Sequence, residues 1–132
     1  MEDNALHILL ADDTAMNLSL GVKLLNRRGH NVTTAEDGLQ AFEAYKAGTF
    51  DVILMDVQMP VMGGIDSTRE IRKYEGEHPD KKPTPIIALT ANTSEEDRQL
   101  YLDAGMNAMI TKPFNIKTIV QDIKDVIESF QK

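Results

Sequence analysis

Acidic side chains, a hydroxyl and an amine stand at the ends of short apolar runs in this 132-residue chain. Asp12-Asp13 and Asp56 follow two of these runs, and Thr90 and Lys112 follow two others. Carboxylates gathered in one place repel one another, and a hard divalent cation such as Mg²⁺ relieves that repulsion because it prefers oxygen ligands. A carboxylate nucleophile, a metal ion, a hydroxyl and an ammonium group together suit phosphoryl transfer. The pattern points to that chemistry if the fold brings these residues together.

The elements that must position these residues are five apolar runs that alternate with segments of helical spacing. The runs are rich in Ile, Val and Leu without the alternation of a half-exposed strand, which favours strands buried on both faces. The expected strands cover residues 7–11, 31–35, 51–55, 85–89 and 108–111. Strand followed by helix, repeated five times, predicts an α/β fold with a parallel sheet between two helical layers.

A strand order of 2-1-3-4-5, as in the flavodoxin-like (βα)5 fold, would make the first and third strands central neighbours. Ligands bind such sheets beyond the carboxyl ends of the strands, where the strand order reverses. Asp12, Asp13 and Asp56 would then meet, with Thr90 and Lys112 beside them. A single Asp at a strand end is more often a helix cap, but five polar residues of suitable types at the ends of four strands favour one shared site.

Composition excludes several other functions. The chain has 14 Lys and Arg against 21 Asp and Glu, a net charge of −7, which disfavours binding to nucleic acid or an anionic membrane. It has no Cys, so disulfides and thiolate chemistry are excluded. Its apolar runs are far shorter than the ~20 residues of a membrane span. We expect one cytoplasmic domain over residues 1–132, with a structured core at about 7–130.

At the run ends, the motifs resemble those of the receiver domain of two-component response regulators. The resemblance covers essentially the whole chain. The sequence around Asp56 is similar to that of receiver domains attached to hybrid sensor kinases. The matching residues are Ala11-Asp12-Asp13 with Asn17, Val52-Ile53-Leu54-Met55-Asp56-Val57-Gln58-Met59-Pro60-Val61-Met62-Gly63-Gly64, Leu89-Thr90-Ala91 and Thr111-Lys112-Pro113-Phe114.

The resemblance assigns the acidic residues to a phosphoacceptor site. It implies that Asp56 accepts a phosphoryl group from a phosphohistidine on a histidine kinase or a histidine phosphotransfer protein. Asp13 and Asp56 would bind Mg²⁺ directly, and Asp12 would bind it directly or through water. The backbone carbonyl of Gln58 would be a further ligand.

The same resemblance gives Thr90 and Lys112 the role of holding the phosphoryl oxygens. It implies a phospho-switch or phosphorelay module that assists its own phosphorylation and dephosphorylation but is not an enzyme. It allows a weak dimer on phosphorylation, while the acidic composition argues against a nucleic-acid or membrane partner. Met109 departs from the family, because many receivers carry Tyr or Phe there as a switch. Gly63, where Asp is common, forms a Gly pair with Gly64 that we expect to loosen the loop after Asp56.

Two other functions on an α/β scaffold fit the sequence less well. A phosphatase of the haloacid-dehalogenase type places a second Asp two residues after its nucleophile as a general acid. That position is Gln58 here, which cannot exchange a proton usefully at neutral pH. A flavin-binding module would need a phosphate-cradling loop after the first strand, where Asp12-Asp13 would repel phosphate unless a metal intervened.

The remaining polar segments have structural interpretations. His7, His30 and His78 have no metal-ligand spacing and are expected to be ordinary surface or edge residues. The proline-containing stretch from Tyr74 to Pro85 is expected to be an exposed loop. Residues 93–96, Thr-Ser-Glu-Glu, read as a capping box that opens a mostly polar helix.

Overall fold

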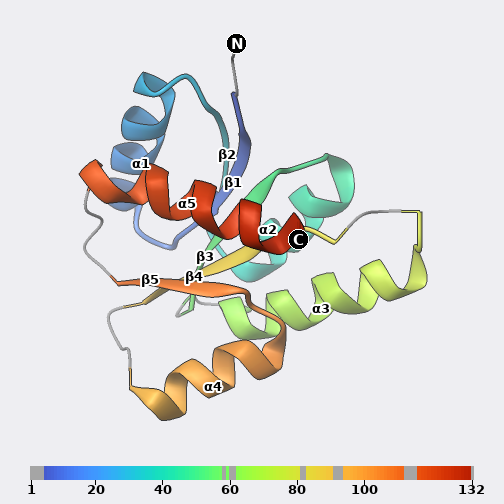
Figure 1. The fold of residues 1–132 in the computed structure, drawn as a ribbon. Helices are drawn as coiled ribbons and strands as arrows, with labels where there is room; N and C mark the ends of the chain where they lie inside the picture. Colours follow the sequence, from blue (N-terminus) through green and yellow to red (C-terminus); the bar gives the residue numbers. More distant parts are fainter. Residues whose placement is uncertain are drawn as a thin grey trace.

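A computed structural model describes residues 5–57, 59, 62–80, 83–90, 94–111 and 116–131. Within these residues, five parallel strands form one sheet in the order β2-β1-β3-β4-β5, which confirms the predicted topology (Figure 1). The strands are β1 (His7–Ala11), β2 (Asn31–Ala35), β3 (Val52–Asp56), β4 (Ile86–Thr90) and β5 (Ala108–Thr111). The helices are α1 (Ala15–Arg27), α2 (Gly38–Ala47), α3 (Gly64–Glu77), α4 (Glu95–Ala104) and α5 (Ile116–Gln131).

The sheet separates two hydrophobic cores. Successive side chains of a strand point to opposite faces, so Ile8 and Leu10 join one core while Leu9 and Ala11 join the other. The first core includes residues of α1 and α5, and the second includes residues of α2, α3 and α4. Figure 1 shows α1 and α5 on one side of the sheet and α3 and α4 on the other. Both faces are covered, which explains why the central strands read as continuous apolar runs.

Strand register places the acidic residues at one edge of the sheet. The central strands β1 and β3 pair in parallel, and Ala11 lies opposite Met55. The residue that follows each of these two is an acid: Asp12 directly after β1, and Asp56 as the last residue of β3. Parallel pairing therefore carries both carboxylates to the same edge.

Helix α3 extends into the stretch that was predicted to be a loop. The stretch from Tyr74 to Pro85 was predicted to be an exposed loop, but residues 74–77 lie within α3 and Thr84 is buried, whereas residues 78–80 and 83–85 form no helix or strand. Tyr74 packs edge-to-face against Tyr45 of α2, with ring centroids 5.9 Å apart. Glu75 accepts a hydrogen bond from the Tyr45 hydroxyl, 2.9 Å, and another from the Thr84 N–H, 2.9 Å. These tertiary contacts stabilise the last turn of the helix, which the local sequence signals did not reveal.

Helix α4 begins at Glu95, and its reciprocal cap joins Ser94 to Asp97, one residue beyond the box predicted over 93–96. Ser94 is the N-cap, and its hydroxyl oxygen accepts a hydrogen bond from the Asp97 N–H at 3.2 Å. The Asp97 carboxylate in turn accepts from the Ser94 hydroxyl at 2.8 Å. The acidic first turn also suits the positive end of the helix dipole. Neither α4 nor any other helix in the described part of the chain has the length and apolarity needed to cross a bilayer.

Candidate functional site

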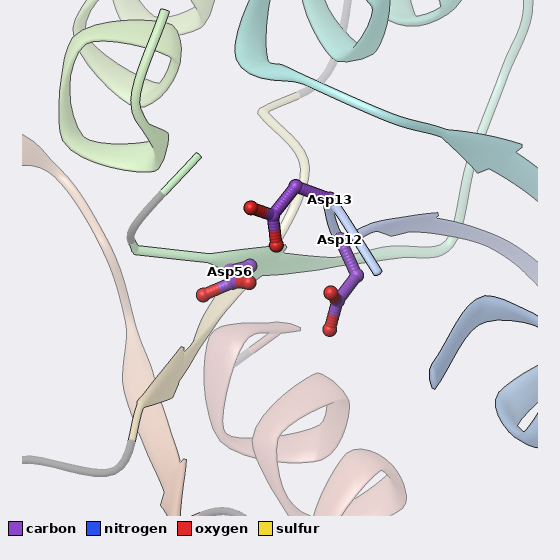
Figure 2. Close-up of side chains that lie close together, drawn as sticks. All are labelled: Asp12, Asp13 and Asp56. Atoms are coloured by element: carbon purple, nitrogen blue, oxygen red, sulfur yellow. The ribbon is translucent and has the colours of Figure 1, made fainter. Parts of the chain in front are cut away.

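Three carboxylates converge at the carboxyl ends of the two central strands. Asp12, Asp13 and Asp56 each offer an oxygen, and these oxygens lie within 4.8 Å of one another (Figure 2). Asp12 and Asp56 are 0% and 5% exposed, whereas Asp13 is exposed to solvent. The structure thus brings together the acids that the sequence analysis singled out, with two of them buried and one open to water.

The turn before α1 orients the first two acids. The Thr14 N–H donates to Asp12 Oδ1 at 2.9 Å, and Asn17 Nδ2 donates to Asp12 Oδ2 at 3.3 Å. The Thr14 hydroxyl donates to Asp13 Oδ1 at 3.3 Å. Thr14, rather than either acid, is the N-cap of α1. These bonds offset part of the cost of burying the Asp12 carboxylate.

The oxygen cluster fits a magnesium ion. Mg²⁺ binds oxygen at about 2.0–2.1 Å in an octahedron, so neighbouring and opposite ligand oxygens lie roughly 3–4 Å apart. The Asp12, Asp13 and Asp56 oxygens, all within 4.8 Å of one another, are close to that spacing. The exposed Asp13 leaves one side open to the waters that Mg²⁺ retains. Gln58, the source of the expected carbonyl ligand, lies outside the described residues.

The backbone at the start of α3 packs closely against the backbone of Asp56. Gly64, the first residue of α3, is buried so tightly that an added Cβ would collide with the Asp56 carbonyl oxygen. The Gly64 N–H also donates to the Val57 carbonyl at 3.1 Å. The Gly63-Gly64 pair was expected to loosen this loop, but at Gly64 the missing side chain serves close packing instead. Gly64 lets α3 begin directly against the end of β3.

Thr90 is the last residue of β4, the strand that pairs with β3 and its terminal Asp56. Asp56 pairs with Leu89, so Thr90 stands one residue further along the same edge. Its side chain is 7% exposed, and its hydroxyl lies 3.2 Å from the hydroxyl of Tyr101 on α4. Tyr101 was not predicted to belong to the site, although an aromatic residue in a mostly polar helix is a signal that it is buried. Lys112 lies outside the described residues.

Met109 of β5 is not aromatic, and the aromatic residue near the end of β4 comes from α4 instead. Met109 lies on β5 opposite Ala88 of β4 and packs against the core that contains Tyr101. Its thioether stands where many receiver domains are expected to carry an aromatic residue. The structure shows that α4 supplies an aromatic hydroxyl to the end of β4 through Tyr101.

Comparison with known proteins identifies the type of domain that the sequence motifs resemble. The sequence model of the response regulator receiver domain matches residues 8–124. Hybrid signal transduction histidine kinase I of Dictyostelium discoideum is 39% identical over 128 residues. That match covers 91% of this chain and 7% of the kinase, so this chain spans a small part of that relative's length.

Solved structures agree with the sequence match. The receiver domain of sensor histidine kinase PA1611 from Pseudomonas aeruginosa PAO1, with a magnesium ion coordinated in its active site cleft, is 36% identical. Its TM-score is 0.81, covering 95% of this chain and 99% of that one. The co-crystal structure of Saccharomyces cerevisiae histidine phosphotransfer signaling protein Ypd1 with the receiver domain of Ssk1 matches with a TM-score of 0.88 and 27% identity. This second match covers 95% of this chain and 90% of that one.

Proposed function

This chain belongs to the family of response regulator receiver domains, and on that premise we propose that it accepts a phosphoryl group on Asp56. It would act as a phospho-switch or phosphorelay module of two-component signalling. The convergence of Asp12, Asp13 and Asp56 at the ends of β1 and β3 is the observation that carries this proposal. A family match alone does not place three carboxylates within 4.8 Å, and their burial pattern leaves an approach from solvent.

The proposed step is an in-line transfer to a carboxylate. An Asp56 oxygen attacks the phosphorus of a phosphohistidine, a P–O bond forms, and the P–N bond breaks as the imidazole leaves with its electron pair. The Thr90 hydroxyl donates a hydrogen bond to one phosphoryl oxygen, and the Lys112 ammonium neutralises charge on the others. Thr90 is suited to this role because it ends the strand adjacent to β3.

The acidic cluster would hold the metal for this step. Asp12, Asp13, Asp56 and the backbone carbonyl of Gln58 are the proposed ligands of one Mg²⁺, with Asp12 binding directly or through water. A bound Mg²⁺ supplies positive charge against the phosphoryl oxygens and offsets the repulsion among the carboxylates. The oxygen spacing and the exposure of Asp13 support this assignment.

The proposed partner is a histidine kinase or a histidine phosphotransfer protein. The support is the similarity to part of a hybrid histidine kinase and to a receiver crystallised with a phosphotransfer protein. In this proposal residues 1–132 form one cytoplasmic receiver domain with a core at about 7–130. It is a phosphoacceptor that assists its own phosphorylation rather than an enzyme acting on free substrates. Gln58 at the position of a phosphatase general acid supports that distinction.

Intact-mass measurement after incubation with acetyl phosphate and Mg²⁺ tests the proposal. We expect the addition of one phosphoryl group to the parent chain and none to Asp56→Asn. Asp51→Asn is a matched control, because Asp51 lies just before the opposite end of β3, where it accepts a hydrogen bond from the His7 N–H. It should be labelled like the parent. Undiminished labelling of Asp56→Asn overturns the assignment, and repeated turnover of a phosphomonoester would favour a phosphatase.

A further inference from the structure

A buried hydrogen bond ties the end of β4 to helix α4. The Thr90 and Tyr101 hydroxyl oxygens lie 3.2 Å apart, and the two residues are 7% and 3% exposed. α4 is otherwise mostly exposed, with Tyr101 and Ala104 as its buried residues. Tyr101 therefore connects a polar surface helix to the edge of the sheet that carries Asp56.

The polarity of this bond follows from the number of protons available. Each hydroxyl has one proton to donate, whereas its oxygen can accept. A phosphoryl oxygen only accepts, so Thr90 can bind it only by donating its single proton. Thr90 can then keep its bond to Tyr101 only as the acceptor, with the phenol as the donor. A phenol is the more acidic of the two hydroxyls and is suited to donate.

We propose that Tyr101 is a positioning residue for phosphoryl transfer to Asp56, because its hydroxyl donates to Thr90 Oγ1 and leaves the Thr90 proton for a phosphoryl oxygen. The inference rests on the proposed function. Tyr101 does not touch the phosphoryl group in this arrangement; it acts through Thr90. Without the phenol hydroxyl, the Thr90 hydroxyl rotates more freely and is oriented less often toward the group being transferred.

The fold holds Tyr101 in place independently of Thr90. The Met106 N–H donates to the Tyr101 carbonyl at 3.0 Å and closes the end of α4. Gly105 at this C-cap has a φ of 112°, a conformation that favours glycine. Its carbonyl accepts from Arg72 Nε of α3 at 3.0 Å. A residue anchored by a neighbouring helix can orient Thr90 rather than follow it.

Met109 of β5 cannot take over the role proposed for Tyr101. Met109 packs against the same core as Tyr101, and a thioether has no proton to donate. It cannot orient the Thr90 hydroxyl by donating to it. Tyr101 supplies that donor from a different element of the fold.

Phosphorylation kinetics of Tyr101→Phe test the proposal, with acetyl phosphate and Mg²⁺ as the probe and intact mass as the readout. Phe keeps the ring and loses only the hydroxyl. A neutral hydrogen bond corresponds to about a two- to tenfold change in rate. We expect a decrease of that size in the maximal rate with little change in the half-saturating acetyl phosphate concentration, since the bond acts on the transferring group.

Tyr45→Phe is the matched control. Tyr45 is equally buried, and its hydroxyl donates to Glu75 rather than to Thr90. Losing that hydroxyl should lower the melting temperature without changing the phosphorylation rate. A slower Tyr101→Phe beside an unchanged Tyr45→Phe therefore separates positioning of Thr90 from a general loss of stability.

A double-mutant cycle shows whether Tyr101 acts through Thr90. Thr90→Val keeps the side-chain shape without the hydroxyl, and in that background Tyr101→Phe should have no further effect on the rate. A Tyr101→Phe rate equal to the parent overturns the proposal. A faster rate also overturns it, because it would mean that Thr90 donates to Tyr101. If the parent chain takes no phosphoryl group on Asp56, the proposed function itself fails, which is a different outcome.

Discussion

The Leu6 N–H donates a 3.0 Å hydrogen bond to Nδ1 of His30, joining the segment before β1 to the residue before β2. Accepting this bond requires an unprotonated Nδ1. His30 is 6% exposed, and desolvation lowers its pKa, with a smaller effect from the positive charge of Lys124. The expectation that His30 is an ordinary surface residue was wrong, because its side chain is buried and accepts a hydrogen bond from the segment that enters β1.

We expect stability to decrease as the pH falls below about 6.5, the ordinary pKa of histidine. In the unfolded chain His30 takes up a proton near that pH, whereas in the folded protein it does so only at a lower pH. The unfolded state binds more protons in between, so acidification lowers the free energy of unfolding. Above about pH 6.5 the contribution is fully present.

Urea denaturation between about pH 8 and pH 5, above the ordinary carboxylate pKa values, measures this effect. His30→Asn retains a short acceptor for the Leu6 N–H and does not titrate, so its stability should vary less with pH. The matched control is His78→Asn, which removes an exposed imidazole whose Nδ1 lies 2.9 Å from the Tyr74 carbonyl oxygen, and which should leave the contribution of His30 in place. Equal slopes for His30→Asn and the parent would contradict the prediction.

Gly64→Ala should destabilise the protein by about 1–3 kcal/mol, because its Cβ would collide with the Asp56 carbonyl. It should also slow phosphorylation by displacing Asp56. Gly76→Ala is the control within the same helix, since a Cβ there meets nothing within 4 Å. It should stabilise by up to ~1 kcal/mol through the better helix propensity of alanine. Urea denaturation compares the two, and a Gly64→Ala variant as stable as the parent would refute the close-packing argument.

Arg72 connects α3 to the start of β4 and β5. It donates to Glu75 Oε1 at 2.9 Å, and the two side chains are 22% and 6% exposed. Its other acceptors are the Thr84 carbonyl at 2.9 Å, Asn107 Oδ1 at 2.9 Å and the Gly105 carbonyl at 3.0 Å. Removing the guanidinium would leave a buried carboxylate without this cation and several acceptors without this donor.

Arg72→Met should therefore destabilise the fold by about 3 kcal/mol or more. The matched control is Arg69→Met, one turn earlier on α3. Arg69 forms a 3.6 Å pair with Asp66, with side chains 54% and 70% exposed, so its loss should cost less than ~1 kcal/mol. Chemical denaturation of both variants measures the difference. Similar losses for the two would show that the Arg72 contacts add little beyond a surface ion pair.

Mg²⁺ should raise the melting temperature, because it binds the assembled carboxylates and not the separated ones of the unfolded chain. With a dissociation constant on the order of 1 mM, about 10 mM Mg²⁺ contributes ~1.4 kcal/mol. For a chain of this length that corresponds to roughly 4–6 °C.

Asp13→Asn should have two opposite effects on these melting curves. It should raise the melting temperature in EDTA by relieving repulsion, and it should reduce the rise produced by Mg²⁺ by removing a ligand. Asp103→Asn, which changes an exposed acid of α4 that accepts a hydrogen bond from Gln99, should respond to Mg²⁺ like the parent. A full Mg²⁺ response in Asp13→Asn would remove Asp13 from the ligand set.

The strands and their order were predictable because burial on both faces leaves a strong local pattern. Runs such as 52–55 are continuously apolar, and each β-strand is separated from the next by a helix, which restricts the sheet to a few topologies. Once the order was set, the polar residues after each run had to share one edge. The convergence of Asp12, Asp13 and Asp56 at that edge followed from the parallel pairing of β1 with β3.

Contacts between distant elements were not predictable in this way. Leu6 and His30 are 24 positions apart in the sequence, and Thr90 and Tyr101 are 11 apart, with no local signal that these groups meet. The sequence by itself determined which residues are apolar, where the chain turns and which acids reach the edge of the sheet. Only the tertiary structure decided which polar atoms face one another, because a hydrogen bond depends on ångström-scale distances set by the packing of whole helices against the sheet.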